Sequence, residues 1–143
     1  MSKVVSIRLK DEQFERLKRA ARRQGRTASE SAARILDEAL RQNEFVWVEF
    51  RDSASGRQAY LKGTRLPIWQ VAWIAHDYAN DVAKTAEHFD LTEYQILAAL
   101  SYATAYPDEI EQAIADNHPT LEELKRLLPW LEVATFQDDE APS

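Results

Sequence analysis

The sequence contains no cysteine among its 143 residues, and it has three glycines and one methionine. Without cysteine the chain forms no disulfide and no thiolate metal site, which excludes a disulfide-stapled extracellular scaffold. The three glycines are far apart, so there is no glycine-rich loop that could cradle a phosphate. No apolar run is long enough to span a bilayer, and the start lacks a secretory signal core. We therefore expect a cytoplasmic protein without membrane contact.

Patterns typical of catalysis are also missing. His76, His88 and His118 have neither the i,i+4 spacing nor the cysteine partners of a metal site. No serine lies in a nucleophile-elbow pattern. The sequence therefore predicts no catalytic residue, no metal and no cofactor, and a protein that is not an enzyme.

Charge is distributed unevenly along the chain. The total is -6, but residues 1–43 contain 11 Lys and Arg against 6 Asp and Glu, a net charge of +5. Residues 44–143 contain 7 basic against 18 acidic residues, a net charge of -11. This asymmetry predicts a polyanion-binding end and a second end with another task.

The basic end has a strand pattern followed by two helix patterns. Residues 4–9 alternate, with Val5, Ile7 and Leu9 on one face, which is the period of a half-buried strand. Residues 11–24 carry acids in the first turn and bases in the last, and Gly25 then predicts the end of a helix. The run 27–30, Thr-Ala-Ser-Glu, has capping-box spacing and predicts a second helix that continues to about residue 41.

One strand and two helices do not bury enough surface to stand alone, so this segment requires a partner. Two such strands paired antiparallel across a two-fold axis would make a ribbon of the size that enters a DNA major groove. Through Ser6-Ile7-Arg8-Leu9, the turn Gly25-Arg26-Thr27 and the helix spacings, about 40 residues resemble the ribbon-helix-helix family of CopG- and Arc-type repressors. The resemblance implies an intertwined dimer that binds operator DNA.

In that arrangement the outward residues of the strand, Val4, Ser6 and Arg8, would read bases, with Arg8 offering its fork to a guanine. Phosphates would be held by the amides and side chains at the start of the second helix and by nearby cations: Lys3, Lys10, Arg26, Thr27, Ala28 and Ser29. The alternative is that Ser6 and Arg8 form the solvated face of an edge strand.

The rest of the chain predicts a β-hairpin followed by helices. Residues 45–50 have strand propensity, residues 52–56 form a turn cluster, and residues 58–61 can return as a second strand. Helices are predicted at 68–78, 82–89, 92–105, 107–115 and 120–128, with Thr92 and Pro107 as start signals. The expected fold class is mainly α with short β.

Residues 82–100 have the proportions of a helix-turn-helix unit. The second helix opens with Thr92, Glu93, Tyr94 and Gln95 and has no basic residue before Ala105, whereas a helix in a DNA groove needs cations. Packing or protein contact is therefore the favoured interpretation of this unit.

The stretch from Tyr60 to Ile114 resembles a VapB-type antitoxin domain, most clearly at Gly63-Thr64-Arg65-Leu66-Pro67. That family is a short helical module often encoded beside a PIN-like ribonuclease toxin. The chain departs from it at Asn80-Asp81, where the family commonly has a glycine-containing turn. The resemblance implies an antitoxin whose amino-terminal module binds its own operator.

The carboxyl-terminal residues suggest a contact with the toxin. An amphipathic stripe with aromatic residues beyond Pro129 fits a helix-in-groove contact, and its candidate toxin-binding residues are Leu121, Leu124, Leu128, Trp130, Leu131 and Phe136. The alternative is that the stripe packs on its own domain. The acidic run 138–140 is suited to a basic cleft, or is a solvated tail.

The sequence thus predicts three parts: residues 1–43 for DNA binding and dimerisation, residues 44–116 as a hairpin plus helical antitoxin domain, and residues 117–143 as an amphipathic helix with an acidic tail. The expected function is that of a type II antitoxin that binds operator DNA as a homodimer or higher oligomer and neutralises a PIN-like toxin. The alternatives are a stand-alone ribbon-helix-helix regulator with a carboxyl-terminal oligomerisation or interaction domain, and a pure protein-interaction scaffold.

Overall fold

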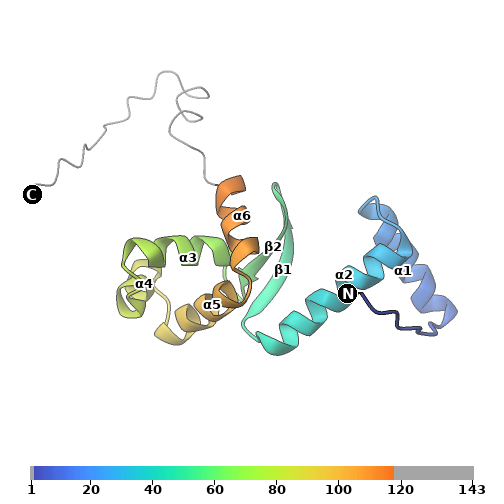
Figure 1. The fold of residues 1–143 in the computed structure, drawn as a ribbon, viewed down its shortest axis with the longest axis horizontal. Coiled ribbons are helices and arrows are strands. Elements are labelled where there is room, and N and C mark those ends of the chain that lie inside the picture. Colours follow the sequence, from blue (N-terminus) through green and yellow to red (C-terminus); the bar gives the residue numbers. More distant parts are fainter. Residues whose placement is uncertain (1, 118–143) are drawn as a thin grey trace, which may run out of the picture.

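The computed structural model describes residues 2–117, which form six helices and one two-stranded antiparallel hairpin (Figure 1). The helices are α1 (Asp11–Arg23), α2 (Ala28–Glu44), α3 (Ile68–Asp77), α4 (Val82–Phe89), α5 (Glu93–Ala105) and α6 (Pro107–Asn117), and the strands are β1 (Val48–Ser53) and β2 (Gly56–Leu61). The mainly helical class with short β is therefore confirmed. Within residues 2–117, no helix combines the length and the apolar character that crossing a bilayer would require.

Helices α1 and α2 form a helical pair at the amino-terminal end, joined by a tight turn (Figure 1). Gly25 adopts φ 63°, the left-handed conformation that glycine accepts without a steric cost. The Thr27 hydroxyl then caps α2 by accepting a hydrogen bond from the Glu30 N–H at 3.1 Å. Both predicted helices are confirmed, and α2 extends three residues beyond the predicted end at about residue 41.

The strand predicted over residues 4–9 is not shown. Residues 2–10 have no regular secondary structure, and each of them is exposed. A strand is held by hydrogen bonds to a neighbouring strand, and among residues 2–117 the two strands present pair with each other. The described part of the chain therefore offers this segment no partner.

The hairpin predicted between residues 45 and 61 is confirmed, with shifted bounds. Strand β1 starts at Val48 instead of residue 45, because the preceding residues turn sharply and the Val48 N–H donates to the Phe45 carbonyl at 2.9 Å. Val48 pairs with Leu61 and Ser53 with Gly56 in the antiparallel register. The tip is stabilised by the Ser53 hydroxyl, which donates to the Gly56 carbonyl at 2.7 Å.

Helices α3 and α5 pack on the hairpin, and α4 and α6 pack on α3 and α5, around one apolar core. Its fully buried side chains come from all layers: Leu61 from β2, Ile68 and Val71 from α3, Ile96 and Tyr102 from α5. Asp81 and Thr92 cap the amino-terminal ends of α4 and α5, respectively. Their side chains accept hydrogen bonds from the N–H groups of Lys84 and Gln95. The helices predicted for residues 68–115 are confirmed to within about two residues, whereas the helix predicted at 120–128 lies outside the described residues.

The turn between α3 and α4 contains two consecutive non-glycine residues in the left-handed region. Ala79 has φ 54° and Asn80 has φ 62°. Their N–H groups close the end of α3 by donating to the carbonyls of His76 and Ala75, at 3.0 and 2.7 Å. Asparagine tolerates this conformation, but an alanine there carries a cost of roughly 1–2 kcal/mol.

Ala79→Gly is therefore expected to stabilise the protein by about 0.5–1 kcal/mol, because relief of the left-handed strain exceeds the extra entropy of the unfolded chain. Urea unfolding followed by circular dichroism measures the change. Ala83→Gly, at an exposed position of α4, is the matched control and should instead destabilise by up to about 1 kcal/mol. Equal losses in both variants would contradict the strain argument.

Candidate nucleic-acid interface

The three predicted base-reading residues lie on the extended amino-terminal segment. Val4 is 95% exposed, and Ser6 and Arg8 are exposed as well. The segment enters α1 through Lys10, whose N–H donates to the Gln13 side chain at 3.0 Å. The side chains predicted to contact bases are thus accessible, and they lie three to seven positions before the start of α1 at Asp11.

The alternate residues of the same segment are apolar and also exposed. Val5 is 77% exposed, Ile7 68% and Leu9 44%. Ile7 and Leu9 border a shallow hollow of about 400 Å³ together with Phe14 of α1 and Ala28 of α2. Side chains from the segment and from both helices therefore border one common hollow.

The helical pair continues this apolar surface. Phe14 is 45% exposed, and on α2 Ile35, Leu36 and Leu40 are 46%, 50% and 57% exposed. Isolated exposed apolar residues are common on protein surfaces, but a contiguous set marks an interaction site. The amino-terminal module therefore has a face that is suited to burial against another molecule.

Four of the six predicted phosphate-binding residues, Arg26, Thr27, Ala28 and Ser29, lie at the start of α2. Thr27 caps the helix, its carbonyl accepts from the Ser31 N–H at 3.0 Å, and its hydroxyl accepts from Glu30. The N–H groups of Ala28 and Ser29 have no acceptor within the first turn. Arg26 is exposed beside them, and Lys3 and Lys10 are exposed on the amino-terminal segment. A 17-residue helix that starts beside an arginine provides donors and a dipole suited to an anion.

A polar cluster that was not predicted from the sequence joins α2 to α5 and α6. The Arg41 guanidinium donates to the Tyr102 hydroxyl at 2.8 Å and to Glu109 at 2.7 Å, and the Tyr102 hydroxyl donates to Glu109 at 2.5 Å. Arg41 also lies 3.9 Å from the centre of the Tyr106 ring and is paired with Asp37 at 3.1 Å. We call Arg41, Tyr102 and Glu109 the clasp.

The clasp changes the acid–base properties of its members. Burial and the hydrogen bond with Glu109 raise the pKa of Tyr102 above its usual value, so its hydroxyl remains a donor through the physiological range. For Arg41, burial lowers the pKa, but hydrogen bonds to Glu109 and Tyr102 outweigh burial and raise it. Glu109 thus contributes to raising the pKa of both Arg41 and Tyr102.

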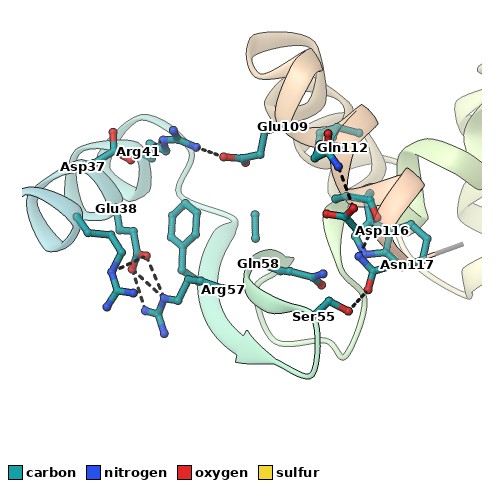
Figure 2. Close-up of a pocket in the computed structure, with 16 residues that line it drawn as sticks. Asp37, Glu38, Arg41, Ser55, Arg57, Gln58, Glu109, Gln112, Asp116 and Asn117 are labelled. Carbon is teal, nitrogen blue, oxygen red and sulfur yellow. Dashed lines mark hydrogen bonds and ion pairs between the residues drawn. The ribbon is translucent and has the colours of Figure 1, made fainter. Parts of the chain in front are cut away.

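A second ion pair joins α2 to the hairpin. Arg57 of β2 donates to both carboxylate oxygens of Glu38, with its closest contact at 2.8 Å, and this hydrogen bond raises the pKa of Arg57. Figure 2 shows Arg41 of α2 and Glu109 of α6 pointing toward each other at one edge of a pocket, with the paired Glu38 and Arg57 at the lower left. The pocket has a volume of about 340 Å³. Two ion pairs between residues distant in sequence, Arg41–Glu109 and Glu38–Arg57, thus attach α2 to α6 and to the hairpin.

The other predictions concern the toxin-binding residues, the helix-turn-helix-like unit and the absence of a metal site. The toxin-binding candidates Leu121, Leu124, Leu128, Trp130, Leu131 and Phe136 lie outside the described residues. The helix-turn-helix-like unit is formed by α4 and α5, and α5 packs mainly on α3 and α4. Among residues 2–117, no three His, Asp or Glu side chains gather in a group that could hold a metal ion. Comparisons of the chain with family models, with curated proteins and with solved structures give no match.

Proposed function

We propose that this protein is a dimeric DNA-binding antitoxin, which binds operator DNA through an antiparallel ribbon formed by residues 4–9 of two chains and neutralises a PIN-like ribonuclease toxin. The observation that carries the DNA-binding part is the continuous apolar face of the amino-terminal module. Val5, Ile7 and Leu9 are exposed, and Ile7 and Leu9 border one hollow with residues of α1 and α2. Pairing of two segments would satisfy their backbone groups and bury this face at the same time.

Electrostatics supports the same proposal. Residues 1–43 have a net charge of +5; Lys3, Arg8 and Lys10 are exposed on the extended segment, and Arg26 is exposed just before α2. In a paired ribbon, Val5, Ile7 and Leu9 face the helices, so Val4, Ser6 and Arg8 face outward. Arg8 would then reach guanine O6 and N7, while the α2 amides hold a phosphate.

The toxin-binding part of the proposal rests on charge and on the family resemblance. Residues 44–143 have a net charge of -11, which suits a basic partner. The α4–α5 unit is not suited to DNA, because α5 contains no basic residue and begins with Glu93. A protein contact is the better use of this half of the chain.

Arg8→Ala is expected to weaken binding to the chain's own promoter DNA by about 1–3 kcal/mol, or roughly 5- to 150-fold, because a bidentate base contact is lost. Fluorescence anisotropy at physiological salt, with a scrambled duplex alongside, measures the loss and shows whether it is confined to the specific sequence. Arg16→Ala is the matched control, since Arg16 lies on α1, pairs with Glu12 at 2.8 Å and should not reach a base.

Binding that is equal for both duplexes and unchanged in Arg8→Ala would refute operator recognition by the ribbon. A second experiment, co-expression with the product of the adjacent gene, distinguishes an antitoxin from a stand-alone DNA-binding regulator. A stable complex that suppresses ribonuclease activity supports the antitoxin, whereas specific DNA binding without such a partner supports a stand-alone regulator.

A further inference from the structure

Helix α5 is apolar on two opposite faces. Ile96, Ala99 and Tyr102 are completely buried in the core. On the other side, Tyr94 is 65% exposed and Leu97 54%, and no charged residue follows Glu93 before the helix ends at Ala105. A helix that is apolar all round is normally covered on all sides.

The residues between α2 and β1 extend this exposed face. Val46 is 63% exposed, and the Trp47 ring meets the Tyr94 ring edge to face, with centroids 6.0 Å apart. Val46, Trp47, Ala98 and Ser101 border a small hollow of about 130 Å³. Tyr94, Leu97, Ala98 and Ser101 follow the i, i+3, i+4, i+7 spacing of one helix face. We call Val46, Trp47, Tyr94, Leu97, Ala98 and Ser101 the α5 patch.

The α5 patch contains both a protrusion and a socket. Leu97 and Tyr94 project from it, while the hollow beside Ala98 and Ser101 is close in size to a cavity of about 150 Å³, which accepts a benzene-sized group. A contact across a two-fold axis needs such self-complementarity, because the same surface is used by both copies: if residue i of one copy contacts residue j of the other, then j of the first contacts i of the second. The small side chains of Ala98 and Ser101 would also let two helices approach closely.

Charge is compatible with a second copy of the chain. None of the six residues of the α5 patch is charged; Glu93 directly precedes Tyr94, and Glu44 is an exposed residue that also lines the hollow. In an antiparallel pair of α5 helices centred near Leu97, a rise of about 1.5 Å per residue separates the two Glu93 by roughly 12 Å along the axis, beyond the Debye length of about 8 Å. DNA is disfavoured here by these same acids.

We propose that the α5 patch is a second self-association surface, through which two copies of this chain pair their α5 helices, with Leu97 of each copy entering the hollow of the other. This contact is separate from the amino-terminal ribbon. If both form, dimers join into tetramers or longer assemblies, which would place two ribbons on one DNA duplex.

The test is sedimentation velocity of the full chain over a wide concentration range, with four proteins: the wild type, Leu97→Glu, Ile7→Asp and the double variant. The wild type is expected to reach the mass of at least four chains, each single variant two, and the double variant one. Ala83→Glu adds the same charge to the exposed face of α4, outside the patch, and should keep the wild-type mass. Circular dichroism checks that each variant is folded.

The same experiment separates this proposal from the proposed function. If Leu97→Glu halves the mass and Ile7→Asp does not, the α5 contact stands and the ribbon dimer fails. If Ile7→Asp halves the mass and Leu97→Glu does not, the α5 contact is overturned.

Hydroxyl-radical labelling of Tyr94 identifies what covers the patch. Protection that grows with concentration supports a second copy. Protection at every concentration without a change in mass would mean that residues 118–143 of the same chain cover the patch. Absence of protection would mean that the patch is uncovered in the purified protein and is available to a different protein. Either result overturns the proposal.

Discussion

Replacing Tyr102 by alanine is expected to lower the free energy of unfolding by about 3–5 kcal/mol, a large share of the 5–15 kcal/mol typical of a domain. The Tyr102 ring is completely buried and meets Phe45, Phe50 and Tyr106, with ring centroids 4.9 to 6.3 Å apart. Alanine would leave a cavity at this junction and remove the hydroxyl that links Arg41 to Glu109. Urea unfolding followed by circular dichroism measures the loss.

Tyr102→Phe separates the ring from the hydroxyl. The packing is kept, and Arg41 still pairs with Glu109 at 2.7 Å, so the expected loss is about 1 kcal/mol. Equal losses for the phenylalanine and alanine variants would mean that the hydrogen bonds, and not the packed ring, dominate this site. A loss below about 1 kcal/mol in Tyr102→Ala would contradict its place at the centre of the core.

The local elements of this fold follow from local signals in the sequence. Thr27 and Thr92 were predicted as helix starts, and both cap their helices because a hydroxyl at that position accepts an otherwise unpaired N–H. Gly25 was predicted to end α1, and its positive φ gives the physical reason. Caps and turns depend on a few consecutive residues, so one sequence suffices to find them.

The contacts between distant segments could not be predicted in this way. In the clasp, Arg41 contacts Tyr102 and Glu109, which follow it in the sequence by 61 and 68 positions. Arg57 pairs with Glu38 across 19 positions. Arg41 has the spacing of an ordinary i,i+4 surface pair with Asp37, which conceals its longer-range role. Residues 45–47 have strand propensity but form a turn, since the chain must pass from α2 into the hairpin.

The strand predicted for the amino-terminal segment cannot form within residues 2–117 of a single chain. Its alternation predicts a strand, but a strand requires a neighbour, and the proposed neighbour is the same segment of a second chain. The exposed apolar residues of this segment and of the α5 patch are features that burial on one chain does not explain. These two surfaces are where the proposed dimer and the proposed second contact belong.

Ile7→Asp is expected to reduce affinity for the specific duplex by about a thousandfold or more, to the level of non-specific binding. Ile7 is 68% exposed on the described chain, so the variant should fold normally as a single chain. In the proposed ribbon the same side chain is buried at the two-fold axis, where a carboxylate would be costly without a partner. The variant should therefore lose the contact between the two amino-terminal segments, and with it the paired ribbon that reads DNA.

The matched variant is Arg8→Ala, one residue along the strand and on its other face. It should keep the mass of the wild type while losing specific DNA affinity, whereas Ile7→Asp should lose both. Sedimentation velocity without DNA and fluorescence anisotropy with DNA, measured on the same preparations, separate assembly from base reading. If Ile7→Asp retained both its mass and its affinity, the ribbon would not be the dimer interface, and DNA binding would have to be assigned to another surface of the basic amino-terminal module.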